Sequence, residues 1–259
     1  MKRFTPVVIT IAGSDSSGGA GIQADLKVIN HCGGFGTTAI TALTAQNISG
    51  ISHVQPASPK SIYEQIKMIA SALPVAAAKT GMLFSREIIR SVVRAFDHFH
   101  IPVIVVDPVM VATSGTPLLK SSAIRAVTRH LIPRAAIVTP NMHEAAILGM
   151  HIGSTINELM QATAQLATRY HVPFLLKGGH GILQGADIFS DGKKTVLING
   201  THIPAQNTHG TGCALSAGIA AHLAAGMKLL PAIRAAKAHV RNALAHQYRL
   251  SSTISYPSF

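Results

Sequence analysis

Short apolar runs alternate with longer amphipathic segments along most of this chain, and no other feature constrains the fold as strongly. The longer segments repeat apolar residues at helical spacing, whereas the short runs suit buried strands. Strands alternating with helices are typical of βαβ units, which build a mainly parallel sheet covered by helices. The predicted strands are 7–12, 37–46, 76–81, 103–107, 135–139 and 173–179, and the predicted helices between them are 22–32, 61–73, 86–99, 121–132 and 156–171.

The pattern changes after Gly179. Asp191 and Gly192 stand between two apolar runs, and Asp-Gly in this position is a signal for a β-hairpin. Two further helices are predicted, over 211–225 and 229–248. Because no linker, low-complexity stretch or repeat interrupts the chain, we expect one α/β domain over residues 1–259.

Membrane and export functions are not expected. No window reaches the roughly 18 consecutive apolar residues of a membrane-spanning helix. The basic start and the apolar run 7–12 resemble a signal peptide, but the run is short and a glycine-rich loop follows it, so we interpret it as the first strand. Two cysteines, Cys32 and Cys213, offer no disulfide framework, and a reducing, cytoplasmic location is expected.

The net charge of +12 raises the question of a nucleic-acid partner. The basic residues are spread along the chain, however, and Arg86, Arg90 and Arg94 have the spacing of one solvated helix face. With 5% aromatic residues and no Trp, there is little material for stacking bases. We therefore expect no nucleic-acid partner. A basic protein that binds anionic small molecules fits this charge equally well.

The loops that follow the predicted strands carry the polar and glycine-rich residues of this apolar chain. Ligands of open α/β sheets bind at the carboxyl ends of the strands, so these loops should converge on one rim. No P-loop, dinucleotide-binding fingerprint or nucleophile elbow is present. The loops in question are 13–21, 107–110, 139–145 and 177–181.

A glycine-threonine loop runs directly into a small-residue helix in "QNTHGTGCALSAGIAAHLAAG", residues 206–226. Unpaired N–H groups and the helix dipole at such a junction favour an anion, and Gly210 and Gly212 allow its close approach. Together with Thr211 they predict a phosphate site. Cys213 at this junction is expected to have a lowered pKa and to act as a base or nucleophile. The alternative is a small-residue cap with an inert thiol.

Charged residues at other strand ends suggest metal-assisted phosphoryl transfer. Asp107 ends the strand 103–107 and suits Mg²⁺, bound directly or through water, although a turn cap is the alternative. Glu144 becomes a second candidate because it follows the neighbouring strand, but Asn141 and Glu144 also have the spacing of a capping box. Lys177 could reach a phosphate or simply extend to solvent. Histidines lack metal-ligand spacing, and only His180 and His209 are expected at the rim.

Seven motifs together resemble the hydroxymethylpyrimidine/phosphomethylpyrimidine kinases of thiamine biosynthesis, in the ribokinase-like superfamily. The resemblance implies a three-layer α/β sandwich with a mainly parallel central sheet, ATP with Mg²⁺, and a homodimer. It also implies phosphorylation of 4-amino-5-hydroxymethyl-2-methylpyrimidine and then of its monophosphate. The motifs are "TIAGSDSSGGAGIQADLK" (10–27), "ITALTAQN" (40–47), "KTGM" (79–82), "DPVMVATSGTPLL" (107–119), "TPNMHEAAIL" (139–148), "LLKGGH" (175–180) and "NTHGTGCALSA" (207–217).

The resemblance also implies roles for individual residues. Cys213 would be the base, with Gly210, Thr211 and Gly212 as the anion hole. Asp107 and Glu144 would lie on the Mg²⁺ side, together with Asn141, and nucleotide contacts would come from Lys177, Asn141 and Thr208. Gln46 would pair with the amino edge of the pyrimidine, and Met82 and Val109 would pack against the faces of the ring. The pyrimidine pocket implied is Gly13, Ala20, Asp25, Gln46, Met82 and Val109.

Several positions depart from the family pattern. Thr113 stands where a lysine is common, which bears on the second phosphorylation, and Ala214 replaces the usual threonine. No acidic residue precedes "KTGM", and the tail "YRLSSTISYPSF" lacks the glycine-rich ending of the family. Two alternatives remain open: a pyridoxine/pyridoxal kinase, which shares "GTGC", and a pyrimidine- or ATP-binding regulator without turnover.

Overall fold

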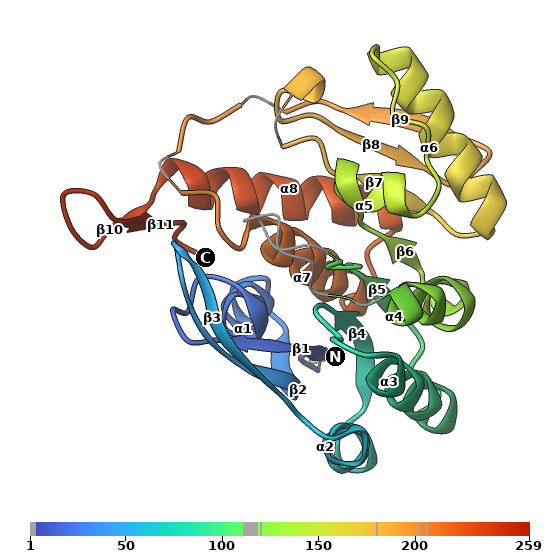
Figure 1. Cartoon of the computed structure of the whole chain (residues 1–259), viewed down its shortest axis with the longest axis vertical. Coiled ribbons are helices and arrows are strands. Elements are labelled where there is room, and N and C mark those ends of the chain that lie inside the picture. The colour runs from blue at the N-terminus through green and yellow to red at the C-terminus, as the bar shows by residue number, and fades with distance from the viewer. Residues whose placement is uncertain (1–3, 111–118, 120, 180, 201, 206) are drawn as a thin grey trace.

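A computed structural model describes residues 4–110, 119, 121–179, 181–200, 202–205 and 207–259. Its centre is a nine-stranded sheet with strand order β3-β2-β1-β4-β5-β6-β7-β8-β9 (Figure 1). The pairs from β2 through β7 are parallel, and antiparallel strands close both edges. The strands are β1 (Val7–Asp15), β2 (Phe35–Asn47), β3 (Gly50–Pro56), β4 (Val75–Thr80), β5 (Ile104–Val106), β6 (Ile137–Val138), β7 (Phe174–Leu176), β8 (Asp187–Ser190) and β9 (Thr195–Ile198).

Helices cover both faces of this sheet. Helices α1, α7 and α8 lie on one face, and α2, α3, α4, α5 and α6 pack into the core of the other. The arrangement is a three-layer sandwich of the α/β class, as the sequence predicts. The helices are α1 (Gly21–His31), α2 (Pro59–Ala72), α3 (Arg86–Phe99), α4 (Ser121–Ala126), α5 (Met142–Ile147), α6 (Ile156–Tyr170), α7 (Thr211–Ala224) and α8 (Leu229–Ala245).

Side-chain alternation along the strands divides the apolar residues into two cores. Val105 faces the core beneath α7 and α8, whereas its neighbours Ile104 and Val106 face the opposite core. Residues of β6 and β7 alternate in the same way, because successive side chains of a strand point to opposite faces. Burial on both faces explains why the sequence shows continuous apolar runs for these strands.

Strand order reverses at β1. The chain goes from β1 through α1 to β2 on one side and later returns, through α2, to β4 on the other side of β1. The loops after β1 and β4 therefore diverge at a topological switch point, where α/β sheets form a crevice at the carboxyl ends of their strands. Helix α7 contacts β1, β4 and β5, which brings its N-terminus to the same end.

The predicted elements are present, with differences at three places. The antiparallel edge strand β3 was not predicted, because most of its residues are exposed or half-buried and show no apolar alternation. The helix predicted over 121–132 is α-helical only to Ala126 and continues as a π-helical turn, Val127–Leu131, and a 3-10 turn, Ile132–Arg134. The tail forms a small hairpin of β10 (Tyr248–Arg249) and β11 (Ser255–Tyr256), which the sequence did not indicate.

Candidate active site

Asp107 and Lys177 form an ion pair beside the N-terminus of α7. Lys177 Nζ lies 2.8 Å from Asp107 Oδ1, and the Ser216 hydroxyl donates to Asp107 Oδ2 at 3.2 Å. A Cβ placed on Gly212 would lie 3.3 Å from Lys177 Nζ and 3.9 Å from Asp107 Oδ2. Residues predicted from three separate loops therefore meet at one point, with the open helix end directed at them.

Glu144 joins this cluster through a capping box at the start of α5. Its backbone N–H donates to Asn141 Oδ1 at 2.9 Å, and its Oε2 accepts from the Asn141 N–H at 2.8 Å. Its other oxygen accepts from the Met110 N–H at 3.2 Å, which ties α5 to the loop after β5. Burial raises the pKa of Glu144, although the positive charge of Lys177 opposes the shift. The capping alternative is thus present, and it places the carboxylate near Asp107.

Cys213 lies in the first turn of α7 and is half-buried. Burial raises the pKa of its thiol to about 11; Lys79 opposes this shift, whereas Asp25 and Asp107 reinforce it. A hydrogen bond from the Gly21 N–H to the sulfur also favours the thiolate. The prediction of a lowered pKa is therefore wrong for the free protein. Desolvation and two nearby carboxylates outweigh the helix dipole, and neither is visible in the local sequence.

The loop that is predicted to bind phosphate is a tight turn. Gly210 has φ of 84°, a left-handed conformation, and the Thr211 N–H and hydroxyl both donate to the Thr208 carbonyl, at 3.2 and 2.9 Å. A Cβ on Gly210 would lie 1.8 Å from the Gly19 carbonyl oxygen, so only glycine fits this contact. The loop is therefore packed directly on the loop after β1.

Asp25 is fully buried and is held by residues that do not belong to the predicted pocket. Lys79 Nζ lies 2.9 and 2.8 Å from its two carboxylate oxygens, and the Thr10 hydroxyl donates at 2.5 Å. Burial opposes a charge on Lys79, but the attraction of Asp25, Cys213 and Asp107 raises the pKa of the lysine. Sequence reasoning missed Lys79, because a single lysine in an apolar strand gave no signal of its partner.

The other predicted pocket residues surround the ends of β1, β2, β4 and β5. A Cβ on Gly13 would lie 2.8 Å from Met82 Cε, so Met82 packs directly on that glycine. The Ala20 N–H donates to Asp15 Oδ2 at 2.8 Å, and Gln46 Nε2 lies 3.1 Å from His209 Nε2. Val109 has φ of 36°, a strained conformation for a β-branched residue. Such strain concentrates at functional sites.

Comparison with known proteins identifies the family. The family model described as phosphomethylpyrimidine kinase matches residues 15–257. The chain belongs to the phosphomethylpyrimidine kinase family. A hydroxymethylpyrimidine/phosphomethylpyrimidine kinase of Rhizobium meliloti is 45% identical over 250 residues, covering 95% of this chain and 93% of the relative. Members of this family are phosphotransferases, and so is this chain.

Solved structures of the family's neighbours share the fold. A phosphomethylpyrimidine kinase from Clostridium difficile superposes with a TM-score of 0.81 at 36% identity, covering 92% of this chain and 99% of that one. A Bacillus subtilis pyridoxal kinase, solved as an ADP complex, gives a TM-score of 0.88 at 31% identity, covering 98% and 97%. The ribokinase-like architecture is therefore confirmed.

The tail of this family member packs against both site loops. The Asn207 side chain donates to the Ser255 carbonyl at 2.8 Å, and Gln247 donates to the Asn207 carbonyl at 2.8 Å. A Cβ on Gly19 would overlap the Tyr256 ring at 2.3 Å, and one on Gly210 would lie 3.2 Å from the Phe259 ring. The tail thus helps to form the rim of the candidate site.

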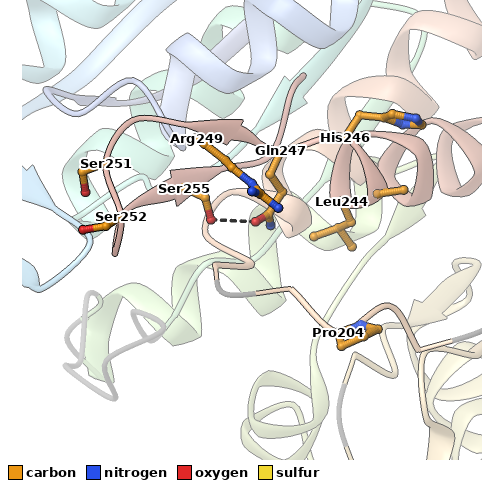
Figure 2. Close-up of a pocket in the computed structure, with 9 residues that line it drawn as sticks. Pro204, Leu244, His246, Gln247, Arg249, Ser251, Ser252 and Ser255 are labelled. Carbon is orange, nitrogen blue, oxygen red and sulfur yellow. Dashed lines mark hydrogen bonds between the residues drawn. The ribbon is translucent and has the colours of Figure 1, made fainter.

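A cavity lies beside that tail and outside the site cluster. Its volume is about 470 Å³, and Figure 2 shows its lining, including the hydrogen bond of 2.6 Å from Ser255 to Gln247. None of the predicted site residues lines it. The lining residues are Pro204, Leu244, Ala245, His246, Gln247, Arg249, Ser251, Ser252 and Ser255.

Two sequence features fall outside the described residues. Thr113, which bears on the second phosphorylation, and His180, expected at the rim, lie in the positions that the structure leaves undescribed. Among the residues that are described, no helix is long and apolar enough to cross a membrane. Within the same residues, no group of three or more His, Cys, Asp or Glu side chains could hold a metal ion.

Proposed function

We propose that the chain, acting as one kinase domain over residues 1–259, transfers the γ-phosphoryl group of ATP to the hydroxymethyl oxygen of 4-amino-5-hydroxymethyl-2-methylpyrimidine. It then phosphorylates the monophosphate to the pyrophosphate, in thiamine diphosphate biosynthesis. The observation that supports this most is the convergence of Cys213, Asp107 and Lys177 at the N-terminus of α7. Relatives at 40 to 45% identity carry the name of this kinase.

Positioning and neutralisation of charge do most of the work in phosphoryl transfer. The N–H groups of Gly212 and Cys213, in the first turn of α7, and the dipole of that helix would stabilise charge on the transferred group. Lys177 adds a positive charge that is already held in place by Asp107. We assign nucleotide contacts to Lys177, Asn141 and Thr208, which lie on or beside this helix end.

Asp107 and Glu144 fit a Mg²⁺ site of the kind that kinases use. Mg²⁺ keeps several waters and is bound by one or two carboxylates together with substrate phosphates. Both side chains are buried, at 2% exposure each, and Asp107 faces the helix end where phosphates would lie. Each carboxylate oxygen already accepts a hydrogen bond, which favours contact through water. The ion would neutralise phosphate charge during transfer.

Cys213 is the candidate base for the substrate hydroxyl. With a pKa of about 11 in the free protein, its thiol is protonated at neutral pH. Burial is the main cause of this raised pKa and the charges of Asp25 and Asp107 add to it, whereas Lys79 and the Gly21 N–H favour the thiolate. Base catalysis therefore requires that bound substrates lower the pKa of the thiol, for instance by offsetting the charge of these carboxylates. Mg²⁺ and a substrate at Asp107 would do so by neutralising its charge.

The decisive experiment measures ATP consumption with Mg²⁺ on hydroxymethylpyrimidine, its monophosphate and pyridoxal, with Cys213→Ala as the control. We expect turnover of both pyrimidines and its loss in the variant. Turnover of the unphosphorylated pyrimidine alone would direct attention to Thr113. Pyridoxal turnover alone would favour a pyridoxal kinase, and no turnover at all would favour a regulator. Pyridoxal kinases are structural neighbours at 29 to 31% identity, lower than the pyrimidine kinases.

A homodimer and a cytoplasmic location complete the proposal. Exposed apolar side chains near the β2–β3 edge, Leu43 and Ile48, would be covered by a second copy. Both cysteines are free thiols, which suits a reducing compartment. Light scattering of the purified protein and cell fractionation test these two points; a monomer at micromolar concentration would argue against the dimer.

A further inference from the structure

His209 lies where three segments of the site meet, and the proposed chemistry leaves it without a role. Its Nε2 atom is 2.9 Å from Asp15 Oδ2 and 3.1 Å from Nε2 of Gln46. Its ring meets that of Tyr256 edge-on, with centroids 6.4 Å apart. One ring nitrogen thus contacts both the last residue of β1 and the pyrimidine-reading residue of β2.

Asp15 determines where the proton of His209 lies. Its carboxylate accepts hydrogen bonds from the backbone N–H groups of Ser17 and Ala20 and from the Ser17 hydroxyl. Burial alone would raise the pKa of Asp15, but the bonds from His209 and Ser17 lower it, so the group is ionised. Because a carboxylate only accepts, Nε2 of His209 must carry a proton. Nε2 carries this proton both in the neutral ring and in imidazolium.

That proton fixes the orientation of the Gln46 amide. A protonated Nε2 cannot accept from an amide N–H, so the Gln46 atom that faces it must be the carbonyl oxygen. The two ends of a glutamine amide have nearly the same shape, and hydrogen bonding decides between them. The amide nitrogen of Gln46 then occupies the position that faces Thr44.

Thr44 leads to the same orientation independently. Its hydroxyl has one hydrogen and lies 2.9 Å from the Ser14 carbonyl, which can only accept. The Gln46 atom 3.1 Å from this hydroxyl must therefore donate to it, as an NH₂ group does. The two ends of the network therefore require the same orientation of the Gln46 amide.

We propose that Asp15 and His209 are positioning residues that hold the Gln46 carbonyl toward His209 and its NH₂ toward Thr44, and thereby set which ring edge the site accepts. The oxygen keeps a second lone pair and the nitrogen a second hydrogen. Side by side, they match a ring edge with an amino donor next to a nitrogen acceptor. This edge is that of a 4-aminopyrimidine, so the inference rests on the proposed function, in which Gln46 contacts the ring.

An analogue with inverted hydrogen bonding tests the inference. The 4-oxo analogue of hydroxymethylpyrimidine presents an acceptor and a ring N–H where the substrate presents a donor and an acceptor. We would measure kcat/KM for both compounds in the wild type, His209→Leu and Asp15→Asn. His151→Leu, an exposed histidine between α5 and α6, is the matched control.

The wild type should favour the amino compound strongly. When the analogue binds, the remaining donor and acceptor of the Gln46 amide would be buried without hydrogen-bond partners. Without the hydrogen bonds from Asp15 through His209, the Gln46 amide can turn. Both variants should therefore lower this preference about tenfold, the effect of roughly one hydrogen bond. The KM for ATP should stay unchanged in both variants. The control variant should keep the wild-type preference. A general loss of activity at an unchanged preference would overturn the proposal, because a merely structural role predicts that result.

Nitrogen-15 NMR of histidine-labelled wild-type protein provides a test that needs no variant and no turnover. The resonance of His209 Nε2, assigned with His209→Leu, should show a protonated nitrogen throughout pH 6–8. An unprotonated Nε2 would contradict the proposed orientation of the Gln46 amide even if the enzyme turned over both pyrimidines. If the wild type phosphorylates neither compound, the proposed function fails, while the NMR result still decides the orientation.

Discussion

Lys79 and Asp25 form an ion pair in which neither side chain is exposed to solvent, and the charges of both residues act on the pKa of the candidate base Cys213. Breaking one member of such a pair leaves the other charged and unpartnered in the interior. We expect Lys79→Met to lower the free energy of unfolding by about 3–5 kcal/mol. Urea unfolding of the wild type and the variant measures this difference in free energy. The double variant Lys79→Met/Asp25→Leu should recover much of the loss, and failure to recover any would show that packing dominates.

Asp107→Asn should lower kcat about 100-fold or more, because it removes the negative charge that orients Lys177 and would bind the metal. The measurement is steady-state kinetics with saturating ATP and Mg²⁺. Asp97→Asn is the matched control, since its bond with Arg134 is on the surface, and its kcat should not change. Removing Mg²⁺ with a chelator should stop turnover, and adding it back should restore turnover.

The raised pKa of Cys213 predicts slow alkylation at neutral pH. The thiolate is the reactive form, so with a pKa of about 11 the rate should increase about tenfold for each pH unit and level off only near pH 11. The rate is followed by mass spectrometry with iodoacetamide on a Cys32→Ser background. A plateau below pH 9 would contradict the raised pKa and support the lowered pKa that the sequence suggested.

His239 should make the protein less stable in mild acid. Burial lowers its pKa, and the charges of His31 and His222 lower it further; its Nε2 has no hydrogen-bond partner among the described residues. The folded state therefore binds fewer protons than the unfolded state, and stability should fall as pH drops from about 6.5 toward the folded-state pKa. Urea midpoints between pH 5 and 8 test this. His239→Leu should flatten the dependence, whereas exposed His151→Leu should not.

Gly19→Ala should displace the tail. The added Cβ would overlap the Tyr256 ring, and overpacking of this kind costs about 1–3 kcal/mol. Thermal unfolding of Gly19→Ala, Tyr256→Ala and the double variant measures the coupling. We expect the double variant to lose less than the sum of the two, and simple additivity would mean that the contact is absent in solution.

The meeting of Asp107, Lys177 and the 210–213 loop could be predicted, because parallel strands end at one edge of a sheet and each loop carried its own signal. The contact between Gln46 and His209 joins residues 163 positions apart, and no local pattern indicates it. The pKa of Cys213 depends on burial and on Asp25, which only the packed structure reveals. The strand β3 was missed because its exposed residues carry no apolar alternation.

The tail contacts have a consequence for protein synthesis. Residues 247–259 leave the ribosome after every strand of the central sheet, yet Tyr256 and Phe259 lie against glycines of the two loops that would hold substrate and phosphate. A nascent chain can therefore pair its sheet while the 207–210 loop still lacks its packing partners. The order of translation thus separates formation of the scaffold from completion of the site, which needs residues 247–259 in place.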